Sequence, residues 1–181
     1  MNEPLGAEEA GRLDRESFVA RFGELYEHSP WVAEAAWERR PFATRGELER
    51  AFDHAVEEAG DAPQLALIRA HPDLAGRAAR EGTLTSASTG EQASAGLDAL
   101  SPEELGRLDE LNGAYRERFG FPYVVAAREH TKDSILADLA ARLGNDPDVE
   151  RRTALGEIGK IARLRLDALV AARDHDTDHG G

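Results

Sequence analysis

Signals that start and stop helices recur at short intervals along this chain, and they constrain its fold more than any other feature. Residues 44–47 and 101–104 each place a carboxylate three positions after a hydroxyl, a pattern that satisfies the free amides of a first helical turn. Pro or Gly interrupts the helical pattern at residues 29–30, 60–61, 71–72 and 120–122. No window shows the alternation of apolar and polar residues that is typical of a strand. The sequence therefore predicts an all-α fold.

The length of 181 residues suits one domain, because a single core commonly occupies about 100–200 residues. We expect a single-domain multi-helix bundle at residues 13–172, with an N-terminal extension at residues 1–12 and a polar C-terminal tail at residues 173–181. Helices are expected at residues 14–28, 30–37, 44–59 and 65–70, from residue 88 onward, and at residues 101–119, 132–143 and 147–172. Residues 82–90 are rich in Ser, Thr and Gly and are expected to form a loop.

Charge and composition exclude several classes of partner. Asp and Glu outnumber Lys and Arg by 35 to 22, and the net charge of −13 repels nucleic acid and anionic membrane surfaces. Uninterrupted apolar runs are only a few residues long, far short of the ~20 that cross a bilayer. The chain contains no Cys, which excludes disulfides and Cys-ligated metals. The expected partner is a small molecule.

Other features bear on location and on metals. The start of the chain lacks the basic and apolar segments of a secretory signal. Arg outnumbers Lys by 20 to 2, which indicates a GC-rich bacterial coding bias, so we expect the bacterial cytoplasm. His175 and His179 lie in the polar tail and are interpreted as incidental, and no metal site is expected.

His71 is the first candidate for chemistry, since an imidazole gives or takes a proton near neutral pH. Pro72 follows it and pushes its backbone out of the helical region, so His71 is expected at a helix end or bend. Two roles remain open: a proton carrier, or a helix-terminal histidine that bonds a free carbonyl.

Ser88, Glu91 and Gln92 form a second group, because their spacing places all three on one side of a first helical turn. Ala95 and Gly96 follow one turn later and leave room beside them. The alternative is a capping box, in which Glu91 only reaches back to the Ser88 amide.

Arg165 lies within an apolar helical stripe formed by Leu155, Ile158, Ala162, Leu166 and Leu169. A guanidinium on an inward face must be paired or bind an anion, so Arg165 either holds a ligand or pairs with a carboxylate such as Glu91. The aromatic and β-branched block at residues 119–125 is a further candidate. Its turn frees backbone amides for a ligand, although its side chains are expected to fill the core.

Five blocks in order resemble the 2-oxo-4-hydroxy-4-carboxy-5-ureidoimidazoline (OHCU) decarboxylases of purine breakdown, over residues 18–170. They are Tyr26-Glu-His-Ser-Pro-Trp-Val, His71-Pro-Asp-Leu, Ser88-Thr-Gly-Glu-Gln with Ala95-Gly-Leu, Asn112-x-x-Tyr-x-x-Arg-Phe-Gly-Phe-Pro-Tyr, and Glu157-Ile-x-Lys-Ile-x-x-Leu-Arg-Leu. The resemblance implies an all-α enzyme without a cofactor, a carbon-carbon lyase, often a homodimer, that converts OHCU to (S)-allantoin in urate degradation.

The resemblance also implies the site residues. His71 is then the catalytic proton donor, and Glu91 is a second catalytic residue that orients the substrate. The implied substrate-binding residues are Pro72, Ser88, Gln92, Tyr123, Val124, Val125, Ala126, Ala127 and Arg165, of which residues 123–127 contribute main-chain contacts. Tyr123 stands where the family often has Phe.

Two other classes of function stay open from the sequence. A non-catalytic helical interaction domain would use the inward polar residues as a structural network. A hydrolase acting on a neighbouring ureide intermediate would need an activated water, and the sequence shows neither a metal set nor a nucleophile–base pair for one.

Overall fold

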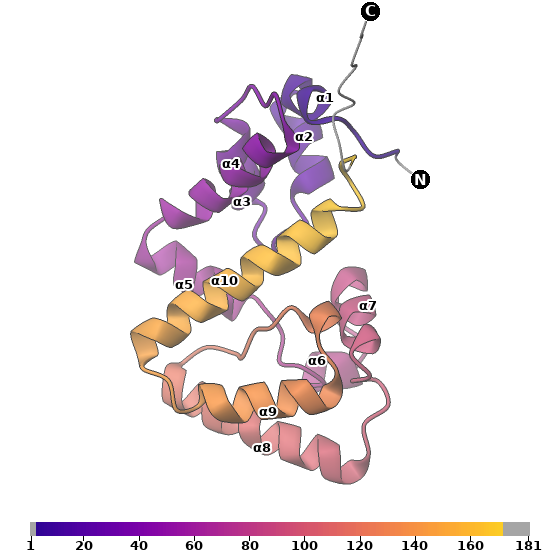
Figure 1. Ribbon diagram of the computed structural model, residues 1–181, viewed down its shortest axis with the longest axis vertical. Helices are drawn as coiled ribbons and strands as arrows, with labels where there is room; N and C mark the ends of the chain where they lie inside the picture. The colour runs from indigo at the N-terminus through magenta and orange to yellow at the C-terminus, as the bar shows by residue number, and fades with distance from the viewer. Residues whose placement is uncertain (1–2, 172–181) are drawn as a thin grey trace, which may run out of the picture. The chain divides into compact units, whose positions relative to one another are not determined.

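The computed structural model describes residues 3–171 and is built from helices (Figure 1). Their bounds are α1 Ala7–Arg12, α2 Arg15–Phe22, α3 Trp31–Trp37, α4 Arg45–Glu57, α5 Asp61–Arg69, α6 Arg77–Arg80, α7 Ser86–Ser94, α8 Pro102–Phe119, the 3₁₀ helix η1 Ala127–Glu129, α9 Lys132–Arg142 and α10 Pro147–Leu166. Strand-like pairing within residues 3–171 is limited to an isolated bridge between Leu5 and Val170. The all-α prediction is confirmed, and the tail predicted at residues 173–181 lies outside the described residues.

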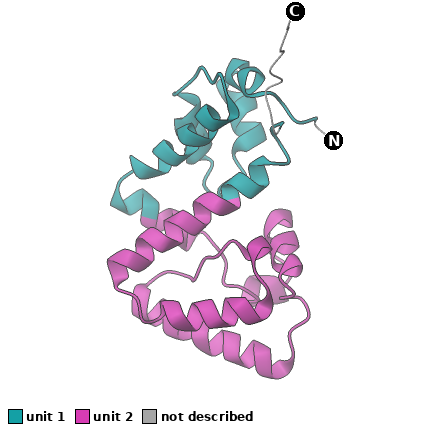
Figure 2. Cartoon of the chain, viewed as in Figure 1, with its two compact units in different colours: residues 1–64, 162–181 teal, residues 65–161 magenta. Residues whose placement is uncertain are grey.

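The described chain forms two compact units (Figure 2). Unit 1 contains residues 3–64 and 162–171, and unit 2 contains residues 65–161. Helices α5 and α10 each contribute residues to both units. Between residues 3 and 171, no helix has the length and apolar character that a bilayer crossing demands.

The core of unit 1 is aromatic. Helix α3 packs against both α2 and α4, and the ring centroids of Phe18 and Phe22 lie 4.7 Å apart. Phe52 from α4 contacts both rings at 6.1 Å. The expected cap of α4 is present, because the Thr44 hydroxyl accepts the Glu47 amide.

Unit 2 is organised around α8 and α9, which pack side by side (Figure 1). Helix α8 opens with the predicted capping box of Ser101 and Glu104 and ends at Gly120, whose φ of 76° suits a residue without a Cβ. Tyr115 on α8 is buried and meets the ring of Tyr123 edge-on at 5.6 Å. This contact places the 121–127 segment against α8.

Four predicted boundaries are wrong, and the first is the start of α5, which lies at Asp61 instead of residue 65. Helix α2 ends at Phe22 instead of residue 28, because the chain turns there and still buries Leu25 and Tyr26. Helix α7 begins at Ser86 inside the expected loop, because Thr85 supplies its cap. Helix α10 ends at Leu166 instead of residue 172, since the chain then pairs with Leu5 through two backbone hydrogen bonds of 3.0 Å.

All three tyrosines of the chain, at positions 26, 115 and 123, are buried, and this predicts a steep loss of stability in alkali. Burial raises the pKa of each phenol above its ordinary value, and a nearby carboxylate adds to the effect. The free energy of unfolding is therefore unaffected below the unfolded pKa of about 10 and falls above it, by about 1.4 kcal/mol per pH unit for each tyrosine.

The measurement is the thermal midpoint from pH 9 to 12, followed together with tyrosinate absorbance. Phenols that ionise near pH 10 in the still-folded protein would contradict this expectation. Tyr123→Phe serves as the comparison and should make the fall with pH less steep.

Candidate active site

His71 lies just after the end of α5 and is 6% exposed. Its amide donates to the Ile68 carbonyl at 3.2 Å, and its Nδ1 lies 3.0 Å from the Leu67 carbonyl oxygen. A carbonyl only accepts, so Nδ1 carries the proton of this bond and the ring exchanges protons through Nε2. The expected position at a helix end is correct. The bond between Nδ1 and the Leu67 carbonyl matches the structural alternative, a histidine that bonds a carbonyl at a helix end. The same bond fixes the tautomer of the ring.

The residues after His71 form a loop, residues 71–76, that side chains from two helices hold in place. We name it the His71 loop. The Ala75 amide donates to Gln92 Oε1 on α7 at 2.8 Å. Asn112 Nδ2 on α8 donates to the Leu74 carbonyl at 3.1 Å. Arg116 Nε, also on α8, donates to both Asp73 carboxylate oxygens at 2.9 and 3.0 Å. Three consecutive loop residues are therefore anchored.

Ala75 in the His71 loop adopts a left-handed conformation with φ 48°. This region costs an L-residue with a Cβ about 1–2 kcal/mol. Such a conformation persists only where the surroundings over-determine it. The bonds from Gln92 and Asn112 to this residue and its neighbour supply that constraint.

The predicted face of α7 points inward, since Ser88, Glu91 and Gln92 are all buried. Thr85 is the cap of this helix, and its hydroxyl accepts the Ser88 amide at 3.3 Å. Ser88 lies inside the helix, so the alternative of a capping box that starts at Ser88 is wrong. Capping therefore does not explain why Ser88, Glu91 and Gln92 are buried. Helix α7 also packs against η1 (Figure 1), which begins at Ala127.

The 121–127 segment links α8 to η1 and has no regular helix before Ala127, the first residue of η1. Residues 123–127 were predicted to contact the substrate through their main chain and to fill the core with their side chains. The side chains are indeed all buried: Tyr123, Val124, Val125, Ala126 and Ala127. Two backbone groups are already engaged by side chains from other helices. The Ala126 amide donates to Glu157 Oε2 at 2.9 Å, and the Val124 carbonyl accepts from Arg142 Nη1 at 2.9 Å.

Arg142 on α9 joins this segment to a buried acidic group. Its Nε donates to the fully buried Glu150 at 2.6 Å. Burial acts to lower the pKa of Arg142, but the hydrogen bond and charge of Glu150 outweigh it and hold that pKa above its usual range. Tyr123 donates its hydroxyl to Asp138 at 2.6 Å. The guanidinium is thus a permanent cation that fixes the carbonyl of Val124.

Arg165 lies in unit 1, and its side chain is buried as the helical stripe predicted. It forms an ion pair of 3.0 Å with Glu27, and the exposed fractions of the two side chains are 8% and 2%. Arg165 Nη1 also donates to the Glu24 carbonyl at 3.3 Å. The carboxylate partner Glu27 was not singled out from the sequence, although it belongs to one of the five blocks.

The residues predicted for the site fall into two groups. His71, its loop, the α7 face and the 121–127 segment all belong to unit 2, whereas Arg165 belongs to unit 1. Within unit 2, Gln92 joins α7 to the His71 loop and η1 joins α7 to the 121–127 segment.

The sequence model of one family, described as OHCU decarboxylase, matches residues 11–167. A protein of Haloferax volcanii named 2-oxo-4-hydroxy-4-carboxy-5-ureidoimidazoline decarboxylase is 49% identical over 162 residues, which are 90% of this chain and 94% of that protein. This chain belongs to the OHCU decarboxylase family. The resemblance seen in the sequence is therefore confirmed.

Solved structures agree with membership of the OHCU decarboxylase family. The crystal structure of (S)-allantoin synthase matches with a TM-score of 0.73 and 31% identity over 90% of this chain, which spans 53% of the synthase chain. A crystal structure of OHCU decarboxylase in the presence of (S)-allantoin has a TM-score of 0.63 and 24% identity, and the match covers 85% of this chain and 96% of that one. The second match shows the shared fold alone.

Asn112, Arg142 and Glu157 hold the site but were not singled out from the sequence. Asn112 and Glu157 lie in blocks that carry the family resemblance, but nothing in those blocks shows which backbone groups they bond. The inward position of Arg142 could have been predicted from the sequence. It shares the buried face of α9 with Ile135 and Leu139, the same stripe argument that identified Arg165.

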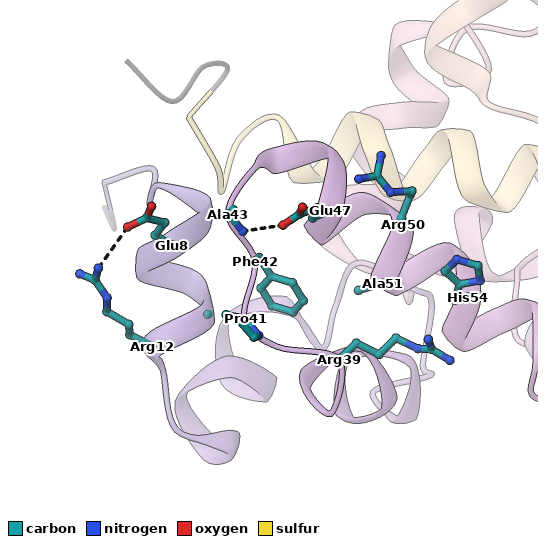
Figure 3. A pocket seen from close by; sticks show the side chains of 11 residues that line it. Glu8, Arg12, Arg39, Pro41, Phe42, Ala43, Glu47, Arg50, Ala51 and His54 are labelled. Atoms are coloured by element: carbon teal, nitrogen blue, oxygen red, sulfur yellow. Dashed lines mark hydrogen bonds and ion pairs between the residues drawn. The ribbon is translucent and has the colours of Figure 1, made fainter. Parts of the chain in front are cut away.

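Cavities in the described chain add one detail. A cavity of about 420 Å³ in unit 2 is lined by residues that include Ala75, Gln92 and four leucines. A cavity of about 670 Å³ in unit 1 is lined by none of the predicted site residues (Figure 3). Two of its arginines, Arg12 and Arg39, pair with glutamates.

Across residues 3–171, no group of three or more His, Cys, Asp and Glu side chains has a geometry suited to a metal ion. The arrangement that the structure does offer is a buried imidazole with one fixed proton. That imidazole is followed by an anchored loop and belongs to the same unit as a buried carboxylate on α7.

Proposed function

We propose that this chain is a carbon-carbon lyase that decarboxylates OHCU to (S)-allantoin in urate degradation, without a metal or organic cofactor. The observation that carries the proposal is the buried His71, whose Nδ1 proton is held by the Leu67 carbonyl and whose loop is bonded to the inward face of α7. Membership of the OHCU decarboxylase family supports the choice of substrate.

The chemistry follows from the groups in the substrate's name. One ring carbon carries both a hydroxyl and a carboxylate, and its neighbour carries the ureido group. When the bond to the carboxylate breaks, CO₂ leaves and the adjacent unsaturation takes up the electron pair. The ring nitrogen of that unsaturation gains a proton, the hydroxyl gives up its proton and becomes a carbonyl, and the ureido-bearing carbon gains a proton. One proton is consumed per turnover, so the protein must orient the substrate and deliver that proton.

His71 supplies the proton in this proposal. The imidazolium releases it from Nε2, and the neutral ring that remains keeps its proton on Nδ1, the tautomer that the Leu67 carbonyl stabilises. General acid catalysis of this kind contributes about 10²–10⁴-fold in rate. Delivery from a fixed direction explains a single enantiomer of the product.

The α7 face and the 121–127 segment position the substrate in this proposal. Glu91 orients the hydroxyl, and Ser88 and Pro72 line the substrate. Gln92 already accepts the Ala75 amide through Oε1, so its NH₂ group is the one that donates to the ureido oxygen. The main chain of residues 123–127 supplies further contacts. Arg165, proposed from the family resemblance, holds an anionic oxygen of the substrate.

The test is a coupled reaction. OHCU is generated from urate with upstream enzymes, this protein is added, and circular dichroism follows the appearance of (S)-allantoin while CO₂ release is measured. Equal amounts of CO₂ and (S)-allantoin are expected. No acceleration over buffer would favour a non-catalytic interaction domain, and loss of OHCU without CO₂ would favour a hydrolase.

Activity is expected to survive exhaustive chelation, because the proposed chemistry uses only the imidazole, carboxylate, amide and guanidinium groups of the chain. The measurement compares the rate of (S)-allantoin formation before and after EDTA treatment and dialysis. Loss of activity that one added divalent ion restores would overturn the cofactor-free proposal.

We also propose that the protein is a cytoplasmic homodimer without nucleic acid or membrane partners. Relatives of this kind are often dimeric according to the family resemblance, and the net charge of −13 opposes anionic surfaces. Sedimentation equilibrium reports the dimer directly, as a mass near twice the chain's 19.7 kDa.

A further inference from the structure

The His71 loop receives bonds from two different helices at adjacent residues. Asn112 is buried on α8, and its Nδ2 donates to the Leu74 carbonyl at 3.1 Å. Gln92 on α7 accepts the Ala75 amide at 2.8 Å. Ala75 is also the residue with the left-handed φ of 48°. A side chain outside the proposed substrate contacts therefore fixes the loop at its most constrained point.

We propose that Asn112 is a positioning residue that aims His71 Nε2 at one face of the substrate. This inference rests on the proposed function. The ring of His71 is held on one side by the Leu67 carbonyl, and the backbone on its other side leads directly into the loop that Asn112 holds. Without the Asn112 bond, Leu74 loses its anchor and Ala75 is held by Gln92 alone, so the loop shifts and the backbone of His71 moves with it.

A change in the direction of His71 Nε2 has a consequence that a loss of folding stability alone does not have. Proton transfer requires donor and acceptor within about 2.6–3.2 Å, and a shift of about 1 Å costs up to about 10²-fold in rate. An intermediate protonated by bulk water gains its proton on either face. The enantiomeric excess of the allantoin formed therefore reports the direction of His71, independently of how much protein is folded.

The experiment compares Asn112→Leu, which keeps the volume but removes the donor, with Leu108→Ala. Leu108 is a buried residue on the same helix α8, so its truncation lowers stability without removing a bond to the His71 loop. Enzyme concentrations are adjusted so that each variant converts OHCU at the same overall rate, which equalises the uncatalysed background. The readouts are kcat per folded protein, KM and the enantiomeric excess.

Asn112→Leu is expected to lower kcat by about 10–10²-fold, to change KM little, and to lower the enantiomeric excess. Asn112→Gln retains an amide donor and is expected to recover part of the lost kcat and part of the lost enantiomeric excess. Leu108→Ala should lower the thermal midpoint while kcat per folded protein and enantiomeric excess stay at wild-type values. If Asn112→Leu behaves as Leu108→Ala does, the residue only supports the fold and the inference is wrong.

A surface variant keeps the test decisive if Asn112→Leu does not fold. Arg116→Gln releases Asp73 of the same loop, and the Arg116 side chain is half exposed, so the core is untouched. A smaller fall in enantiomeric excess with an unchanged thermal midpoint is expected. An unchanged excess for a folded Arg116→Gln would then overturn the inference. Wild-type protein that forms no (S)-allantoin would instead refute the proposed function itself.

Discussion

Turnover of OHCU by the His71→Asn variant is expected to fall by at least about 10²-fold, the lower end for a lost general acid, while the thermal midpoint changes little. The substitution separates the two nitrogens of the ring. An Asn amide nitrogen reaches nearly the position of His Nδ1, so it can still donate to the Leu67 carbonyl that lies 3.0 Å from Nδ1. It has no atom at the position of Nε2, where the proposal places the transferred proton.

The matched control is His71→Gln, whose longer amide reaches toward the Nε2 position and abandons the Nδ1 bond. It should also lose turnover, since an amide is no acid at neutral pH. It should in addition be less stable than His71→Asn, because the buried Leu67 carbonyl loses its donor. The residual product of both variants should approach a racemate. A His71→Asn enzyme with wild-type kcat and a single enantiomer would remove His71 from the mechanism.

Local signals predicted the parts of the fold that local contacts determine. The capping box at Ser101 was correct, and the Thr44 hydroxyl caps α4 as predicted, because these hydrogen bonds join residues three positions apart. The other half of the pattern at Thr44 differs, since Glu47 binds the Ala43 amide instead of the Thr44 amide. The start of α7 was misplaced because two hydroxyl residues, Thr85 and Ser88, compete to cap it, and the sequence does not say which will bond. The end of α10 depends on Leu5, which is distant in the sequence. No pattern within that helix contains this information.

In the candidate site too, local patterns predicted where residues lie but not which distant groups they bond. His71 was placed at a helix end by the proline that follows it, and Arg165 was placed inward by the helical stripe that surrounds it. Their partners could not be predicted. Glu27 lies 138 positions before Arg165, and Asn112 bonds a backbone carbonyl 38 positions away. A backbone carbonyl looks the same in every residue of a sequence, so its bond to a distant side chain appears only when the chain is folded.

Removal of Arg165 is expected to destabilise unit 1 strongly, since the buried Glu27 carboxylate would lose its guanidinium partner. Arg165→Met keeps the apolar stem of the side chain and deletes its charge. The loss of one partner of a buried ion pair costs about 3–5 kcal/mol, which corresponds to a fall of about 6–20 °C in thermal midpoint for a chain of this size. Calorimetry or thermal circular dichroism measures it. A midpoint within about 2 °C of wild type would show that the pair carries little of the stability.

The double variant Arg165→Met with Glu27→Met separates this structural role from the proposed grip on the substrate. It replaces both charges with apolar side chains, so neither member of this ion pair is left without the other and most of the lost stability should return. The activity should not return with it if Arg165 also holds an anionic oxygen, because no guanidinium is present to bind one. We therefore expect a double variant whose thermal midpoint approaches wild type but whose kcat/KM stays as low as that of Arg165→Met. Recovery of both quantities together would limit Arg165 to its pair with Glu27 and leave substrate binding to the residues of unit 2.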